Sequence, residues 1–193
     1  VAPTEPQRLL TAIANPDIKI ITLTITEKAY CLANNGHSLD IELPIIQHDL
    51  ASPNSAKSAI GMLANGLVMR ARENAAAITI ISCDNLSENS HRLKQVLRDY
   101  LTLCSPETIP WLEENVSFPC SMVDRIVPAM DAEKVDFQSS LLGLIDEAAV
   151  TTEPFSQWII EDNFSTDTPD WASAGVQVVE DIRPFEAIKL RLL

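Results

Sequence analysis

Lys189 is a lysine beside an apolar helical stripe, a position from which it could transfer a proton. It lies in the segment RPFEAIKLRLL (183–193), where Phe185 and Ile188 fall on one helical face at about 100° per residue. Lys189 lies beside this apolar stripe, and Glu186 is within side-chain reach on the same helix. Desolvation generally lowers the pKa of a lysine, which lets it accept a proton near neutral pH. A surface lysine whose stem covers Phe185 explains the same spacing, and periodicity alone favours that interpretation.

Polar residues also end two runs that are rich in β-branched residues, Ile18–Thr26 and Ala77–Cys83. Both runs are too continuous for half-exposed antiparallel strands, and they predict strands buried on both faces of a parallel sheet. Ligands of open parallel sheets bind beyond the carboxyl ends of the strands. Thr26, Asp84 and Asn85 are therefore candidates for a site. Capping of turns and of following helices accounts for Thr26 and Asp84 equally well.

Asp124 is a further polar residue among apolar neighbours. It lies in SMVDRIVP (121–128), a segment whose flanking prolines suit a strand or an extended active-site segment. Arg125 follows it, so a buried ion pair explains Asp124 as well as a role in binding a hydroxyl group.

The elements that must position these residues include strands and helices in alternation. The segment Ser55–Glu73 has apolar residues at helical spacing between the two strand-like runs, which predicts a β-α-β unit and an α/β fold with a right-handed crossover. The stretch Asp84–Ser87 offers N-cap side chains for the helix after it. The other expected elements are helices at 106–116 and 132–147, strands at 121–127, 148–153, 156–162 and 175–181, and a last helix that begins at Pro184.

The signature of a dinucleotide-binding turn is absent. The chain has 5 glycines, and none of them forms the G-x-G-x-x-G pattern that follows the first strand of such folds. Either the fold does not bind a dinucleotide, or the first half of the domain is missing.

Cysteines and histidines show no metal-ligand spacing along the chain. The 3 histidines form no cluster, and no C-x-x-C pair occurs among the cysteines. We therefore predict no metal, and we expect free thiols in a reducing cytoplasm. The cysteines are Cys31, Cys83, Cys104 and Cys120.

Composition narrows the class of protein. The 193 residues fit one domain or a large piece of one, and a hydrophobic content of 46% can form a substantial core. The formal charge of −13 argues against nucleic acid and against anionic membranes as partners. No apolar run approaches the roughly 18–20 residues of a membrane span. No signal peptide is visible, so we expect a cytoplasmic protein.

Five segments together resemble the polyol-specific long-chain dehydrogenase family, which includes mannitol 2-dehydrogenase and fructuronate reductase. They occur in the family's order, with family-like gaps, over nearly the whole chain. The segments IIQHDL, AKSAIG and FPCSMVDRIVPA resemble bacterial fructuronate reductases more than mannitol dehydrogenases. Ala29 stands where the family commonly has glycine. The five segments are LTITEKAYC (23–31), SCDNLSEN (82–89), WLEENVSFPCSMVDRIVP (111–128), TEPFSQWIIEDNF (152–164) and GVQVVEDIRPFEAIKLRLL (175–193).

The resemblance implies a two-domain enzyme with an N-terminal nucleotide-binding domain and a C-terminal, mostly helical substrate domain. Residues 1–182 are then expected to be the later part of a Rossmann-like domain with a mainly parallel sheet, its first half absent. Residues 183–193 are expected to be the first turns of the helix that leads into the substrate domain. Lys189 matches the lysine of the family's active-site pattern, whose asparagine and histidine would follow Leu193.

The resemblance also implies roles for individual residues. Lys189 is expected to be the general acid/base that takes the alcohol proton as the hydride leaves. Asn85 is expected to bind substrate and to stabilise its alkoxide-like oxygen, while Glu186 relays protons between Lys189 and solvent. Asp124 is expected to contact substrate hydroxyls or cofactor. The residues expected beside the cofactor are Thr24, Thr26, Glu27, Val123 and Asp124.

The function implied is a zinc-independent hydride transfer between NAD(H) and a secondary carbinol or ketone, with NADP left open. Fructuronate reduction to D-mannonate is favoured, and the mannitol–fructose reaction is the alternative. A catalytically silent fragment or an α/β binding module is the alternative from another class. The expected partner is a small sugar acid or polyol. The parent protein is expected to be a monomer, and the fragment is expected to self-associate.

Overall fold

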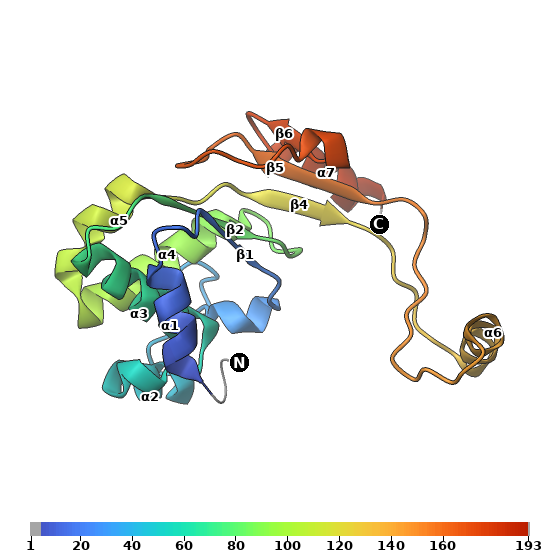
Figure 1. Cartoon of the computed structure of the whole chain (residues 1–193), viewed down its shortest axis with the longest axis horizontal. Helices are drawn as coiled ribbons and strands as arrows, with labels where there is room; N and C mark the ends of the chain where they lie inside the picture. The colour runs from blue at the N-terminus through green and yellow to red at the C-terminus, as the bar shows by residue number, and fades with distance from the viewer. Residues whose placement is uncertain (1–4, 193) are drawn as a thin grey trace.

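A parallel sheet carries the loops in which several candidate residues lie (Figure 1). The structure is a computed structural model that describes residues 5–192. Strands β1 (Ile20–Leu23), β2 (Ile78–Ser82) and β3 (Val116–Ser117) pair in the order β1-β2-β3, and both pairs are parallel. Every residue of β2 is buried, as its continuous apolar run predicts. The β1 strand is shorter than predicted and partly exposed, because it has a partner on one side within the described sheet.

Helices cover this sheet and form the β-α-β unit. The connection from β1 to β2 contains α2 (Pro44–Ala51) and α3 (Ala59–Arg72), and α1 (Pro6–Ala14) packs against α3. A Cβ on Gly66 of α3 would lie 2.6 Å from the Ile13 side chain of α1, so the two helices approach as closely as a glycine permits. Short 3₁₀ helices lie at Glu27–Tyr30 (η1), Pro53–Ser55 (η2), Pro106–Thr108 (η3) and Ala172–Ala174 (η4).

The turn after β2 differs from its predicted form. The helix α4 (Asn89–Cys104) has Glu88 as its N-cap residue, with a φ of 52° and no side-chain cap bond. Asp84 accepts a hydrogen bond from the Leu86 backbone N–H (3.0 Å) and so stabilises the turn itself. The prediction that Asp84–Ser87 caps α4 is therefore wrong. The Asp84 side chain stabilises the turn before the helix, and the Ser87 hydroxyl donates to Glu186.

A second sheet follows α5 (Ile109–Asn115). Strands β4 (Ser121–Asp124), β5 (Gln157–Glu161) and β6 (Gln177–Val179) pair in that order. The β4–β5 pair is antiparallel and the β5–β6 pair is parallel. Pairing is thus mainly parallel, as predicted, although the strands form two sheets of three.

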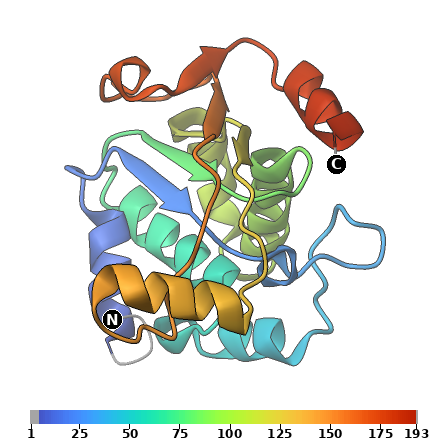
Figure 2. The same ribbon diagram turned by 90° about the vertical axis from the view of Figure 1, so that its right-hand side faces the viewer.

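An arm connects β4 to β5. Figure 1 shows α6 (Ala132–Leu142) far from both sheets, at the end of two extended connections, and Figure 2 shows it from the side on which it projects. The predicted helix is present but ends earlier than Glu147, because Gly143 has a φ of 72° and ends it. The strand predicted at 148–153 is wrong, since this segment has no strand partner. Large apolar side chains on the arm, including Phe137, are exposed.

The last helix, α7 (Arg183–Leu192), packs on β4. A small cluster of buried residues holds the second sheet to this helix, with Phe185 packed against it. Leu193, the end of the predicted helix, lies outside the described residues. Within residues 5–192, no helix combines the length and the apolar character that crossing a membrane requires.

Candidate active site

Lys189 is the point at which three separate segments meet. Its Nζ donates a hydrogen bond to Oδ1 of Asn85 (2.7 Å) and another to the carbonyl oxygen of Val123 (2.6 Å). Asn85 lies in the loop after β2, Val123 lies in β4, and Lys189 lies on α7. The half-buried lysine is therefore fixed by contacts to both sheets. A snorkelling side chain with its amine in water does not describe this geometry.

The side-chain amide of Asn85 has one polar atom that binds Lys189 and one that is available to a ligand. Its Oδ1 accepts from Lys189, and within the described residues its Nδ2 group donates no hydrogen bond to protein. A side-chain amide has two N–H donors on that nitrogen. Asn85 can therefore hold Lys189 and donate to a substrate oxygen at the same time.

Two cavities share Lys189 and Asn85 as lining residues. The smaller has a volume of about 270 Å³ and the larger about 460 Å³. The contact between Lys189 and Asn85 thus borders both cavities. The smaller is also lined by Leu86, Ser121, Met122 and Glu186, and the larger by Val123, Asp124, Arg125 and Gln157.

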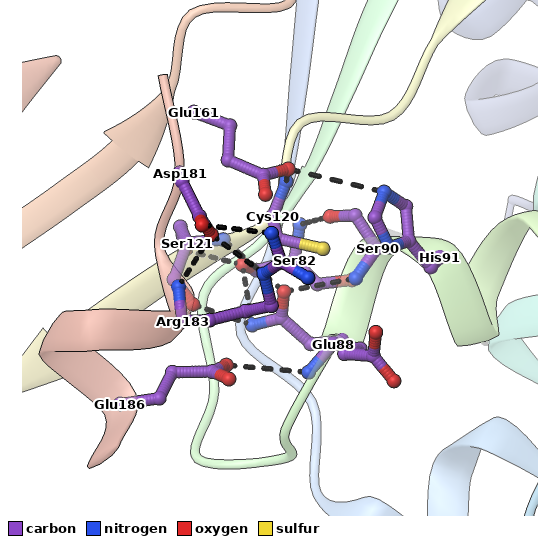
Figure 3. A network of polar contacts seen from close by, with 11 residues as sticks. Ser82, Glu88, Ser90, His91, Cys120, Ser121, Glu161, Asp181, Arg183 and Glu186 are labelled. Carbon is purple, nitrogen blue, oxygen red and sulfur yellow. Dashed lines mark hydrogen bonds and ion pairs between the residues drawn. The ribbon is translucent and has the colours of Figure 1, made fainter. Parts of the chain in front are cut away.

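Glu186 lines the smaller cavity, and its hydrogen bonds go to the residues before α4. Its carboxylate accepts from the Ser87 hydroxyl (3.0 Å) and from the Glu88 backbone N–H (3.2 Å), and Figure 3 shows the second contact. Among the described residues it has no direct hydrogen bond or ion pair with Lys189. The proton relay predicted for Glu186 therefore requires water between the two side chains.

Asp124 is half-buried at the end of β4 and lines the larger cavity. It forms no ion pair within the described part of the chain. Arg125 is exposed and donates through Nε to the Glu153 carbonyl oxygen (3.2 Å). The alternative of a buried Asp124–Arg125 pair is therefore wrong, because Arg125 is exposed and its guanidinium binds the Glu153 carbonyl oxygen instead.

Thr24, Thr26 and Glu27 follow β1 and are exposed. They line neither of the cavities at Lys189. Tyr30, at the end of η1, is buried, and its hydroxyl donates to Asp84. Burial and this contact raise the pKa of Tyr30, so the phenol stays protonated and links η1 to the loop of Asn85.

Asn89 is a residue that sequence reasoning missed. It is fully buried, and its Nδ2 donates to the carbonyl oxygens of Ser82 (3.1 Å) and Ser121 (2.9 Å). Its Oδ1 accepts from the Ser121 backbone N–H (3.2 Å). It thus joins the end of β2 to the start of β4, the strands that lead to Asn85 and Val123. A single asparagine in a polar turn gives no periodic signal of this role.

The cysteines are free, as predicted. Cys83 and Cys120 lie near the junction of the two sheets. Burial raises the pKa of the Cys83 thiol to about 11 and that of the Cys120 thiol to about 12. Neither thiol is a ready nucleophile at neutral pH.

Helices around a largely parallel sheet, with polar groups gathered beyond the strand ends, define a Rossmann-type domain. Among those groups, a lysine amine can transfer a proton and a side-chain amide can donate a hydrogen bond to a nearby oxygen. The Mannitol dehydrogenase Rossmann domain family matches residues 2–173. The chain belongs to this family.

Relatives agree with this assignment. D-mannonate oxidoreductase of Escherichia coli is 45% identical over 185 residues, which are 96% of this chain and 38% of that protein. A solved D-sorbitol dehydrogenase in substrate-free form superposes with a TM-score of 0.90 at 34% identity, covering 100% of this chain and 40% of the other. Pseudomonas fluorescens mannitol 2-dehydrogenase, solved with NAD and D-mannitol, superposes with a TM-score of 0.83 at 39% identity. The match covers 95% of this chain and 37% of that protein. The chain therefore spans well under half the length of these relatives.

Proposed function

We propose that this chain forms part of an NAD-dependent oxidoreductase that interconverts a secondary alcohol and a ketone of a sugar acid or polyol. The proposal rests mainly on the arrangement of Lys189, Asn85 and the Val123 carbonyl group, which meet between two cavities. The mannitol 2-dehydrogenase relative that is solved with NAD and D-mannitol supports both the cofactor and the substrate class.

The residues around the larger cavity fit the nicotinamide end of NAD. The cavity lies next to Lys189 and is lined by hydrogen-bonding groups of Asp124 and Gln157 together with the apolar Val123. Such a mixture of apolar surface and a few polar groups is typical of cofactor sites. Bound NAD supplies the hydride acceptor or donor. Thr24, Thr26 and Glu27, beyond β1, are proposed to contact more distant parts of the cofactor.

Lys189 is proposed to take the proton of the alcohol as its carbon is oxidised, and to return it when the ketone is reduced. Its neutral amine accepts the proton, and the Asn85 oxygen and Val123 carbonyl then hold the ammonium group. The Nδ2 group of Asn85 donates to the developing alkoxide. Asp124 binds a substrate hydroxyl, and Glu186 exchanges the proton with solvent through water.

A sugar acid is the preferred substrate class, with D-mannonate and its ketone fructuronate as the proposed pair. The identity with D-mannonate oxidoreductase supports this choice. The exposed Arg125 also lines the larger cavity, so a substrate that lies against the nicotinamide there meets a cation for its carboxylate. The polyol alternative, mannitol and fructose, is supported by the mannitol 2-dehydrogenase structure.

The test is an assay of NADH oxidation by the whole protein with fructuronate, tagaturonate and fructose, and of NAD reduction with D-mannonate and mannitol. We expect the highest kcat/KM with fructuronate. Turnover of fructose alone would favour the polyol alternative. No turnover of any of these compounds, in a folded protein that binds NADH, would overturn the proposal in favour of a binding module.

A further inference from the structure

Three potential metal ligands of different types meet at a place that the candidate active site does not use. They are His91 of α4, Cys120 just before β4, and Glu161 at the end of β5 (Figure 3). One ligand atom from each lies within 4.8 Å of the other two, and Nε2 of His91 is 3.9 Å from Oε2 of Glu161. The histidine–cysteine–carboxylate set comes from elements that are distant in sequence. Spacing along the chain therefore gave no sign of it.

We propose that His91, Cys120 and Glu161 form a site for a single Zn²⁺ ion. Zinc binds nitrogen, thiolate and carboxylate ligands at about 2.0–2.3 Å, which places neighbouring ligand atoms of a tetrahedron roughly 3.5 Å apart. Closing the cluster to that size requires movement of about 1 Å. His91 is exposed and can provide that movement by rotating its side chain.

The site has a path for entry and a favourable charge. A cavity of about 210 Å³ is lined by the three ligands and by Glu88, Glu180, Asp181 and Arg183. Arg183 donates two hydrogen bonds of 2.8 Å to the Asp181 carboxylate, so the charges of these two side chains neutralise each other. The carboxylates of Glu88, Glu161 and Glu180 remain as negative charges that attract a divalent cation. Glu88 and Glu180, which line the same cavity, are the candidates for a fourth ligand, and water is the alternative.

The buried thiol of Cys120 must lose its proton when it binds a metal ion. The side chain is fully buried, which disfavours the anion of the free thiol. Burial is the largest influence on the pKa of this thiol, and the Glu161 and Glu186 carboxylates raise the pKa further. The backbone N–H groups of Ser90 and His91, in the first turn of α4, lower it by less. The zinc ion displaces the thiol proton to solvent and forms the Zn–S bond, with no change of oxidation state.

One of the three ligands, Glu161, already has a hydrogen bond that positions it. Oε2 of Glu161 accepts from the Cys120 backbone N–H (2.8 Å), which holds this carboxylate beside the thiol. Bound zinc would link α4 to both β4 and β5. It would therefore stabilise the junction between the two sheets.

The test uses Co²⁺ as a spectroscopic probe for Zn²⁺ in the purified protein. We expect one Co²⁺ per chain with a thiolate-to-cobalt charge-transfer band, which Zn²⁺ abolishes by displacement. Cys120→Ser should remove the band and His91→Gln should weaken binding at least tenfold. Cys104→Ser and His37→Gln are the matched controls, and they should leave the charge-transfer band and the affinity for Co²⁺ unchanged.

Thermal unfolding supplies a readout that does not depend on the band. Zn²⁺ at 100 times its Kd should raise the Tm by about 5–10 °C, and the same concentration should leave the Tm of Cys120→Ser unchanged. A band that survives in Cys120→Ser, the absence of any band in the parent protein, or an equal Tm rise in both would overturn the proposal. Equal Tm values of the two proteins without metal exclude misfolding as the cause of a lost band.

Discussion

The two sheets of the molecule differ in how much core each has. The β1-β2-β3 sheet and its helices share a large buried cluster that includes Ile80, Leu97 and Tyr100. The β4-β5-β6 sheet has a buried cluster of only Cys120, Met122, Ile159 and Ile182, and the arm that joins β4 to β5 has no buried residue on its helix. The first sheet therefore supplies stability. The candidate site lies where the second sheet and α7 meet it, since Lys189 comes from one side and Asn85 from the other.

Core truncation should separate the two regions most strongly. Leu97 is completely buried, whereas Phe137 on the arm is 63% exposed. Leu97→Ala should lower the free energy of unfolding by about 2–5 kcal/mol, because it leaves a cavity. Phe137→Ala should change it by less than about 0.5 kcal/mol. Urea titration of both variants checks this, and equal losses would contradict the unequal division of the core.

Loss of the Asn85 amide should affect catalysis and leave stability nearly unchanged. Asn85→Ala in the whole protein should cost about 2.7–4 kcal/mol of transition-state stabilisation, measured as a fall in kcat, if the amide donates to the alkoxide. Asn54→Ala, in the exposed η2 turn, is the matched control. A change confined to KM would assign Asn85 to ground-state binding instead.

Removal of Asn89 should damage stability and catalysis together, since this side chain joins β2 to β4. Asn89→Ala leaves the backbone N–H and C=O of Ser121 without their side-chain partner in the interior, which should cost about 1–3 kcal/mol for each group that water cannot reach. The Ser82 carbonyl oxygen keeps the Ser121 hydroxyl as a donor (2.6 Å). The substitution should also lower kcat, because Asn85 and Val123 lose their common anchor. Denaturant titration together with steady-state kinetics tests this. A stable variant with normal kcat would refute it.

The smallest effect is expected at the start of α3. Ser58 accepts from the Gly61 backbone N–H (2.9 Å) as the helix N-cap and donates to the buried Asp49 carboxylate (2.6 Å), so Ser58→Ala should cost about 1–2 kcal/mol of stability. Ser55→Ala, in the neighbouring turn, should cost less. Thermal unfolding of both, with catalysis unchanged, would show that this part of the first sheet serves stability alone.

Sequence patterns predicted the first sheet better than the second. The apolar run at 77–83 indicates a buried strand because burial on both faces requires continuous apolar residues, and β2 has that environment. The segment 148–153 has strand-like residues but no partner, since pairing depends on the path of the arm. Patterns alone also could not show the antiparallel β4–β5 pair.

The candidate site was predictable only in part. Helical spacing placed Lys189 beside an apolar stripe, and motif resemblance selected it together with Asn85. The two contacts of its amine, to Asn85 and Val123, depend on tertiary packing that no local pattern encodes. Asn89 and the His91–Cys120–Glu161 cluster were missed for the same reason, since their partners come from distant segments.

Chemical rescue tests the central claim, that Lys189 transfers the proton, most directly. Lys189→Ala in the whole protein should lower kcat by about 10²–10⁴-fold with NADH affinity nearly unchanged. A small primary amine added to the assay should restore part of that turnover, because it can occupy the space left by the side chain. Lys134→Ala, on the arm, should behave as the unmodified protein. Near-normal turnover of Lys189→Ala, or a loss that no amine restores and that accompanies lost NADH binding, would contradict the account.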